Sequence, residues 1–191
     1  MAVTTELVKT LRARTGAGVM DCRRALEDAK GDLDAAAELL RAKGLAAAAT
    51  RAGRDASQGI VEAYIHPGNR LGALVEVNCE TDFVARTDEF KTLVRELAMQ
   101  VAATSPHYLS KDEVPAEVMT EQRAAIVREH AGAVEAEIER HLARWLAEVV
   151  LLEQPSIRDA GRRVGDMITD TVARVGENVQ VRRFARFKLG D

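Results

Sequence analysis

Apolar residues in the first part of the chain recur every three or four positions, in three short stretches separated by glycines. This period places them on one face of a helix, so the pattern predicts three short helical segments between about Thr4 and Lys43. Helices of this length are marginal alone and need mutual packing. We therefore predict a compact three-helix module over residues 1–44. Its apolar stripes consist of Leu7, Val8 and Leu11; of Val19, Cys22, Ala25, Leu26 and Ala29; and of Leu33, Ala36, Ala37, Leu39 and Leu40.

Capping signals mark the ends of these segments. The first stripe ends at the turn 15–18, where two glycines occur, and Gly31 stops the second. Either Asp32 or Asp34 is a suitable N-cap for the third segment, and Gly44 is a suitable C-terminal stop. Residues 45–57, rich in alanine and arginine, are then predicted to form a helical or extended linker.

The pattern changes to that of a β-hairpin after the linker. Residues 60–66 and 71–77 are rich in β-branched residues and flank the sequence Pro67-Gly68-Asn69-Arg70. Proline, glycine and asparagine favour a tight turn, so the two runs are predicted to pair in antiparallel fashion.

Helical periodicity returns after the hairpin. It predicts helices over residues 88–103, 116–131, 134–152 and 157–175, with breaks at Pro106 and Pro155. The sequence Gly176-Glu177-Asn178 then turns the chain into a last strand, residues 179–189. Two strands at the start and one at the end, with helices between, predict an α+β domain over residues 58–191 with a small antiparallel sheet.

Composition excludes several classes of protein. The chain has 191 residues and a formal net charge of −3, so no overall basic field favours nucleic acid or an anionic membrane. The cysteines, Cys22 and Cys79, are far apart in sequence, which fits a reducing cytoplasm better than a disulfide framework. The N-terminus lacks a charged-then-apolar leader, and no apolar run approaches membrane-spanning length. We therefore expect a cytoplasmic protein without a membrane partner.

Catalytic signatures are missing from the sequence. The four histidines lack metal-ligand spacing, and the segment Gly16-Ala17-Gly18 follows a helix without the lysine-serine ending of a phosphate loop. No serine lies in a nucleophile-elbow context, and neither cysteine has a histidine nearby in sequence. We expect neither an enzyme, nor a metal site, nor a bound cofactor.

The segment between the hairpin and the next helix, residues 78–86, places an acid beside a large aromatic residue. Loops between rigid elements are common places for binding residues. Thr81 also suits an N-cap of a short turn, and Phe83 suits a staple packed under the following helix. The sequence favours a contact role and a core role for Phe83 about equally. The acidic neighbour Asp82 slightly favours the contact role.

The last strand interleaves basic and aromatic residues, as strands that bind RNA do. Strand alternation places Arg183, Ala185 and Phe187 on one face, and Arg182, Phe184, Arg186 and Lys188 on the other. The cations and aromatics therefore do not separate by face. A core-facing phenylalanine with solvated arginines is the favoured interpretation, and RNA binding is the alternative.

Three ordered motifs resemble bacterial elongation factor Ts, the nucleotide exchange factor of the translational GTPase elongation factor Tu. The first covers residues 7–9, 14–22 and 24–26, including Arg14-Thr15-Gly16-Ala17-Gly18-Val19-Met20-Asp21-Cys22. The second is Glu76-Val77-Asn78-Cys79-Glu80-Thr81-Asp82-Phe83-Val84-Ala85. The third is residues 176–178 leading into Val181-Arg182-Arg183-Phe184. Together the motifs extend over nearly the whole chain.

The resemblance implies a role for each part. Residues 1–44 become a ubiquitin-associated-like module that docks on the GTPase's nucleotide domain. Its docking residues are Thr15, Gly16, Ala17, Gly18, Val19, Met20 and Asp21. The residues implied to dislodge Mg²⁺, and thereby GDP, are Thr81, Asp82, Phe83 and Val84. The partner is elongation factor Tu in its GDP-bound and nucleotide-free states, with no direct contact to nucleic acid.

The length of the chain leaves room for one copy of the family's core, whereas longer members carry two. Short members are associated with homodimers, so we expect a dimer carrying two Tu molecules, with the final sheet or neighbouring helices at the interface. Ala185 stands where a cysteine can occur in the short form, so dimer strength must come from packing. The stretch from Gly132 to Leu146 is shorter than the corresponding family segment. An adaptor that uses the three-helix module for another partner remains a rival function.

Overall fold

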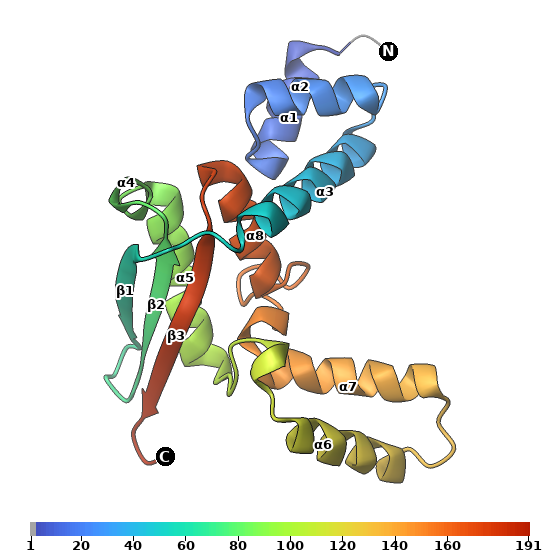
Figure 1. Ribbon diagram of the computed structural model, residues 1–191, viewed down its shortest axis with the longest axis vertical. Helices are drawn as coiled ribbons and strands as arrows, with labels where there is room; N and C mark the ends of the chain where they lie inside the picture. Colours follow the sequence, from blue (N-terminus) through green and yellow to red (C-terminus); the bar gives the residue numbers. More distant parts are fainter. Residues whose placement is uncertain (1–2) are drawn as a thin grey trace. The chain divides into compact units, whose positions relative to one another are not determined.

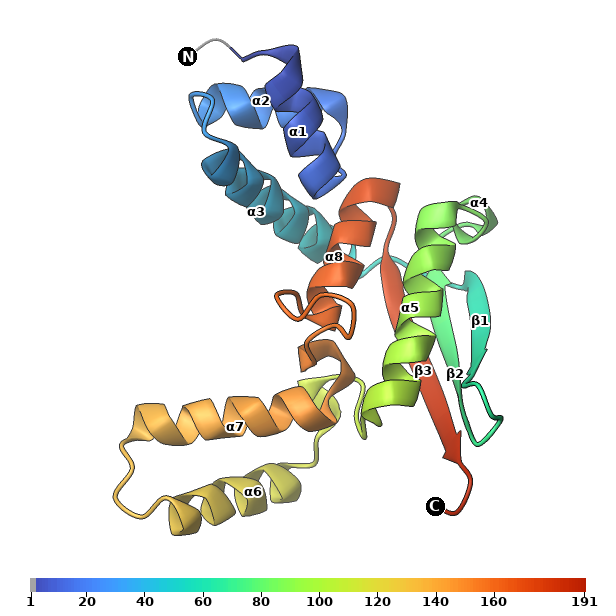
Figure 2. The same cartoon turned by 180° about the vertical axis from the view of Figure 1, so that it is seen from behind.

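The computed structural model describes residues 3–191, which contain helices and one three-stranded sheet (Figures 1 and 2). This confirms the predicted α+β class. The helices are α1 (Thr5–Thr15), α2 (Val19–Asp28), α3 (Leu33–Arg51), α4 (Asp82–Ala85), α5 (Asp88–Thr104), α6 (Ala116–Glu129), α7 (Glu135–Val149) and α8 (Val164–Val175), with short 3-10 turns η1 (Lys111–Glu113) and η2 (Leu151–Glu153). The strands are β1 (Gln58–Ile65), β2 (Leu71–Cys79) and β3 (Val179–Lys188), in the order β1-β2-β3.

The described chain forms two compact units, each assembled from three separate stretches of sequence. The first unit comprises Met1–Gly59, Asn78–Lys91 and Ile168–Gln180. The second comprises Ile60–Val77, Thr92–Met167 and Val181–Asp191. Segments that are distant in sequence are therefore neighbours within each unit.

The first unit begins with the predicted three helices, whose caps satisfy backbone groups that a helix end leaves free. Thr4 Oγ1 accepts a hydrogen bond from the N–H of Leu7 at 3.3 Å. Asp32 is the N-cap of α3, because its Oδ1 accepts from the N–H groups of Asp34 at 2.8 Å and Ala35 at 3.0 Å. The core of the three helices consists of Leu11, Cys22, Ala25, Leu26 and Ala36.

The predicted stop of the third helix at Gly44 is wrong, since α3 continues to Arg51. Gly44 is buried, and a Cβ built on it would lie 3.4 Å from the Cβ of Ala173 in α8. The four alanines at 46–49 are strong helix formers and carry the helix onward. Gly44 therefore marks a close approach of α3 to α8 rather than a helix end.

In the second unit the hairpin forms as predicted. The N–H of His66 donates to the carbonyl of Leu71 at 2.8 Å, and the N–H of Asn69 donates to that of His66 at 3.0 Å. Helix α5 runs along one face of the strands (Figures 1 and 2). Among the described residues of the second unit, no helix lies over the opposite face, which is turned toward the viewer in Figure 1. The apolar core between α5 and the strands includes Ala73, Val75, Val77, Leu93, Val94, Leu97 and Val101.

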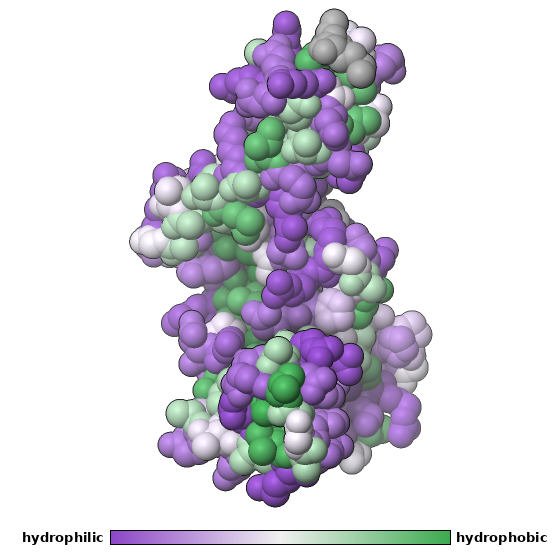
Figure 3. All heavy atoms as spheres, turned by 90° about the vertical axis from the view of Figure 1, so that its right-hand side faces the viewer, coloured by the Kyte–Doolittle hydropathy of each residue, from purple (hydrophilic) through white to green (hydrophobic). Residues whose placement is uncertain are grey.

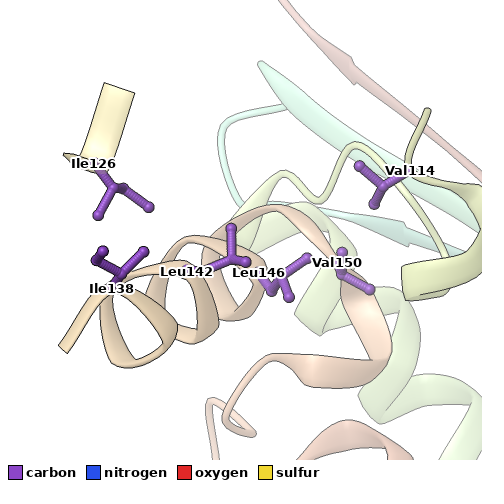
Figure 4. Close-up of a cluster of buried hydrophobic side chains, with 6 residues drawn as sticks. All are labelled: Val114, Ile126, Ile138, Leu142, Leu146 and Val150. Atoms are coloured by element: carbon purple, nitrogen blue, oxygen red, sulfur yellow. The ribbon is translucent and has the colours of Figure 1, made fainter. Parts of the chain in front are cut away.

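Helices α6 and α7 form a hairpin of their own, and both end two or three residues before their predicted limits. Side chains of the two helices and of residues next to them form a buried cluster, drawn in Figure 4, of Val114, Ile126, Ile138, Leu142, Leu146 and Val150. Figure 3 shows the connecting end of this hairpin, where apolar residues are surrounded by hydrophilic ones.

The helix predicted over residues 157–175 begins only at Val164. Side chains of the preceding segment take up its backbone N–H groups, which offers the chain an alternative to the helix. Ser156 Oγ accepts from the N–H of Arg158 at 3.2 Å, and Asp159 Oδ1 accepts from the N–H of Gly161 at 3.0 Å. These local turns replace the first two turns of the expected helix.

The final strand only partly follows the predicted placement of its aromatic and basic residues. Phe184 is half-buried and Arg183 is exposed, as expected. Phe187, however, is 71% exposed, and Arg186 is largely covered, with its Nε donating to the carbonyl of Ala102 at 3.0 Å. The aromatic side chains of β3 thus lie on opposite faces of the sheet.

Candidate functional site

The segment singled out in the sequence, residues 81–85, forms a single helical turn that enters α5 through Arg86 and Thr87. Thr81 has extended backbone angles (φ −126°, ψ 154°) and is the N-cap of α4. Its Oγ1 accepts from the N–H of Val84 at 3.3 Å, and its carbonyl accepts from the N–H of Ala85 at 3.3 Å. The capping role expected for Thr81 is confirmed.

Phe83 points away from its own unit. Its side chain is 76% exposed, while the next two residues, Val84 and Ala85, are buried. The interpretation of Phe83 as a staple under the following helix is therefore wrong. Its neighbour Asp82 is also exposed and pairs with Arg86 one turn later, at 2.6 Å. The turn presents an aromatic ring and a carboxylate side by side at the surface.

Two acidic residues to which the sequence analysis assigned no role hold this turn in place. Glu177, from the turn between α8 and β3, accepts from the backbone N–H of Thr81 at 3.0 Å and from Thr81 Oγ1 at 2.7 Å. Glu80 Oε1 accepts from the N–H of Asn178 at 2.6 Å. The sequence placed the turn 176–178 in the third motif, as the connection into the last strand, and predicted no contact for Glu177. The 96-residue separation between Thr81 and Glu177 left no local signal for their contact.

Cys79 lies beneath the turn and is fully buried. Its Sγ donates to the carbonyl of Thr81 at 3.2 Å. Burial raises the pKa of the Cys79 thiol to about 11, and the nearby carboxylate of Glu177 adds to the rise. The protonated thiol is therefore the state that persists at neutral pH, which suits a hydrogen-bond donor and not a nucleophile.

The second set of predicted site residues, Thr15 to Asp21, forms the loop between α1 and α2 and the first turn of α2. Gly16 adopts a left-handed conformation (φ 68°), and its N–H donates to the carbonyl of Arg12 at 2.8 Å. The following residues expose apolar surface, because Val19 is 51% and Met20 59% exposed. Asp21 pairs with Lys43 at 2.5 Å, and this hydrogen bond lowers the pKa of its carboxyl group.

Both sets of predicted residues lie in the first unit. The C-terminal end of α8 contacts the loop between α1 and α2. The Nη2 of Arg174 donates to the carbonyl of Thr15 at 3.1 Å. Residues 3–191 contain no group of three or more histidine, cysteine or acidic side chains arranged to hold a metal ion. In the same range, no helix combines the length and apolar character needed to cross a membrane.

Comparison with known proteins is consistent along the chain. The sequence model of the family described as Elongation factor TS matches residues 47–191. The chain is similar to proteins named Elongation factor Ts from Carboxydothermus hydrogenoformans (52% identity over 99% of this chain and 90% of that protein) and Herpetosiphon aurantiacus (47% over 100% and 99%). It is also similar to the protein of that name from Caldanaerobacter subterraneus subsp. tengcongensis (50% over 99% and 98%).

These matches place the protein in the class of translation elongation factors. The chain belongs to the elongation factor Ts family, whose members are nucleotide exchange factors acting in protein biosynthesis. The family model begins at residue 47, within α3, so it does not cover most of the three-helix module. The relatives align over that module as well.

Proposed function

We propose that this chain promotes GDP release from the translational GTPase elongation factor Tu, and that the turn 81–84 acts beside the Mg²⁺ of that GTPase. The observation that carries the proposal is the exposed side chain of Phe83 on an otherwise anchored turn. When a partner's pocket buries a large apolar side chain that is exposed to water, the complex is stabilised by about 1.5–3 kcal/mol for full burial. Membership of the exchange-factor family supports the choice of partner.

The mechanism follows from how GTPases hold nucleotide. A phosphate-binding loop, a helix N-terminus and a bridging Mg²⁺ together balance the charge of the diphosphate. Phe83 enters a pocket beside the metal site as a wedge and shifts the segment that supports the cation, while Asp82 places a negative charge nearby. Val84 is buried in its own unit, so it anchors the turn from within. Loss of the cation leaves the phosphates less compensated, and GDP dissociates faster.

Binding energy must distinguish two states of the partner for this to work. By thermodynamic linkage, GDP weakens binding of the factor by the same ratio that the factor weakens binding of GDP. Each tenfold acceleration of release corresponds to a barrier lower by about 1.4 kcal/mol. The contact of Phe83 supplies such a difference because it forms only in the Mg²⁺-free state, whereas contacts of the N-terminal loop add binding energy to both states.

The Thr15–Asp21 loop is the second part of the proposed contact with Tu. Val19 and Met20 offer the apolar surface, and the ion pair of Asp21 with Lys43 joins the first turn of α2 to α3. Docking through this loop keeps the factor bound while the turn 81–84 acts. Residues 1–44 thus serve as the docking module, residues 45–57 as its link, and residues 58–191 as the core and dimerisation domain.

The direct test is the variant Phe83→Ala. Release of fluorescent GDP from Tu, followed by stopped-flow at saturating factor, should slow by up to about a hundredfold, since burial of the ring is worth about 1.5–3 kcal/mol. Val134→Ala, which removes another exposed apolar side chain in the connection before α7, is the matched control and should match the wild type.

The role of Mg²⁺ has its own test. When Mg²⁺ is removed from Tu–GDP with a chelator before mixing, the step assigned to Phe83 has already taken place. The difference between wild type and Phe83→Ala should then shrink toward one. An undiminished difference without Mg²⁺ would refute the dislodging mechanism, though not the exchange activity itself.

We also propose that two copies of the chain pair through the open face of the sheet, giving a complex with two Tu molecules. Alternate positions of the strands place the exposed apolar side chains of Val61, Ile65, Leu74 and Phe187 on this face, and the exposed Leu189 follows the end of β3. An ion pair between Arg183 and Glu76, at 2.7 Å, borders them. Exposed apolar patches of this kind are typical of protein interfaces. Ala185 supplies no thiol, so the association is non-covalent and takes place in the cytoplasm with translation.

A further inference from the structure

The carboxylate of Glu177 makes a two-pronged contact with a single residue of the candidate site. One oxygen accepts the backbone N–H of Thr81 at 3.0 Å, and the other accepts the hydroxyl proton of Thr81 at 2.7 Å. Glu177 is half-buried and lies in the turn between α8 and β3. Hydrogen bonds to an ionised carboxylate are stronger than neutral ones, so this pair fixes both the backbone and the side chain of Thr81.

The direction of the hydroxyl proton matters for the cap. A threonine hydroxyl has one proton to donate and two lone pairs to accept. Because Glu177 takes the proton, a lone pair of Thr81 Oγ1 is oriented toward the N–H of Val84, 3.3 Å away. The carbonyl of Thr81 is occupied as well, by Cys79 Sγ and the N–H of Ala85. Every polar atom of Thr81 is thus engaged within the first unit.

The segment that carries Glu177 is itself held firmly. The Nε of Arg51 donates to the carbonyl of Gly176 at 2.9 Å. Asn178 is buried, and its side-chain amide donates to the carbonyl of Arg54 at 2.8 Å. The backbone N–H of Asn178 donates to Glu80 at 2.6 Å. The turn 176–178 therefore joins the end of α3 to the residues immediately before Phe83.

Helix α4 has only four residues and cannot keep its own geometry, because a single helical turn is unfavourable without outside support. The side chains that pack the core of the first unit do not include Glu177. Loss of its carboxylate would loosen Thr81 and leave the rest of the unit folded. The contact is placed to control the turn specifically.

We propose that Glu177 is a positioning residue for nucleotide exchange, which fixes through Thr81 the direction in which Phe83 leaves the chain. This inference rests on the proposed function of Phe83. A preset direction lowers the entropy that the turn loses when the aromatic ring enters its pocket. The carboxylate touches neither nucleotide nor metal and acts only through Thr81.

The test compares Glu177→Ala, Glu177→Gln and Phe83→Ala, alone and with Glu177→Ala added to Phe83→Ala. Stopped-flow release of fluorescent GDP from Tu is measured over a range of factor concentrations. Glu177→Ala should slow release at saturation by about tenfold and leave the half-saturating concentration little changed, because docking through the Thr15–Asp21 loop persists. Glu177→Gln keeps one acceptor oxygen and should lose less.

A double-mutant cycle separates positioning from an independent contribution. If Glu177 acts through Phe83, adding Glu177→Ala to Phe83→Ala should produce no further loss. Amide hydrogen exchange should accelerate at residues 81–85 in Glu177→Ala, with an unchanged midpoint of thermal unfolding. Glu113→Ala is the matched control, since Glu113 also accepts a backbone N–H, that of Leu109 at 2.9 Å, in the second unit. It should leave release unaffected.

Three results would overturn the proposal. An unchanged release rate in Glu177→Ala, with slow release in Phe83→Ala, would remove the positioning role and leave the wedge intact. Losses that multiply in the double variant would place the action of Glu177 outside the turn. Normal release in Phe83→Ala would refute the proposed wedge itself, and the positioning role with it.

Discussion

Thr81 and Phe83 lie two positions apart and are treated very differently by the rest of the first unit. Thr81 has its N–H, its carbonyl and its hydroxyl engaged in hydrogen bonds, whereas the ring of Phe83 is left in water. An exposed phenylalanine loses the free energy of burial, about 1.5–3 kcal/mol, unless a partner recovers it. A residue that contacts a partner requires this combination of an exposed side chain and a backbone held in place by its neighbours.

Cys79, directly below this turn, gives the site a measurable response to alkaline pH. The thiol has a pKa of about 11 in the folded chain, against a usual value near 9.0. As pH rises, the unfolded chain loses its proton first, so the free energy of unfolding is unaffected below about pH 9 and falls between 9 and 11. Denaturant titrations at stepped pH should show this decline in the wild type and a weaker one in Cys79→Ala. Cys22→Ala is the control and should keep the decline, and an equal decline in Cys79→Ala would contradict the assignment.

At the scale of elements, two glycines with different surroundings show what decides where a helix ends. Gly16 ends α1 with a positive φ, and a Cβ there would meet the guanidinium of Arg174 at 2.5 Å. Gly44 has no positive φ, lies inside α3, and leaves ordinary contact distance to Ala173. Gly16 ends its helix because its backbone turns left-handed, whereas Gly44 stays in the helical conformation and does not.

Substitution of each glycine by alanine should therefore change stability in opposite directions. Gly44→Ala removes the conformational freedom of an interior glycine and should raise the free energy of unfolding by up to about 1 kcal/mol. Gly16→Ala should lower it by about 1 kcal/mol or more, because alanine is strained at this φ and Arg174 must move. Thermal and denaturant unfolding of the two variants measure both effects. A lower free energy of unfolding for Gly44→Ala would contradict this prediction. It would mean that the 3.4 Å between the added Cβ and the Cβ of Ala173 leaves too little room for a methyl group.

Elements whose local signals agree were predictable from sequence, and those in which local signals compete, or distant contacts decide, were not. The hairpin and the helix predicted over 88–103 follow from periodicity and turn chemistry, and the structure selects Asp32 from the two N-cap candidates of α3. The continuation of α3 past Gly44 follows from the helix-forming alanines after it, which outweigh the glycine. The late start of α8 follows from side-chain hydrogen bonds of Ser156 and Asp159, which compete locally with the helix. For the site, sequence supplied the candidates but left Phe83 open between core and contact roles. The contact of Glu177 with Thr81 could not be predicted, because the two residues are 96 positions apart.

At the scale of the whole molecule, the uncovered face of the sheet carries the proposal of a dimer. Leu74 lies within the apolar group on this face and is 45% exposed. A specific interface usually buries at least about 1,200 Å² in total, and an aspartate placed in its centre would carry an unpaired charge into it.

The variant Leu74→Asp should therefore be monomeric by size-exclusion chromatography with light scattering, at concentrations where the wild type is dimeric. Leu45→Asp, which changes an equally exposed leucine on α3, should remain dimeric. Reducing agent should have no effect on either protein, since both cysteines are buried. A monomeric wild type, or a dimeric Leu74→Asp, would contradict the assigned interface.

The measurement that tests the central claim most directly is the release of fluorescent GDP from elongation factor Tu after rapid mixing with the wild-type chain. The account predicts that the rate of GDP release rises with factor concentration and reaches a plateau more than about tenfold above the spontaneous rate. This corresponds to a barrier to release that is lower by more than about 1.4 kcal/mol. Complex formation without acceleration would indicate an adaptor, and salt-sensitive binding of RNA without any effect on Tu would indicate a nucleic-acid-binding protein. Either result would contradict the assignment of this chain as the exchange factor.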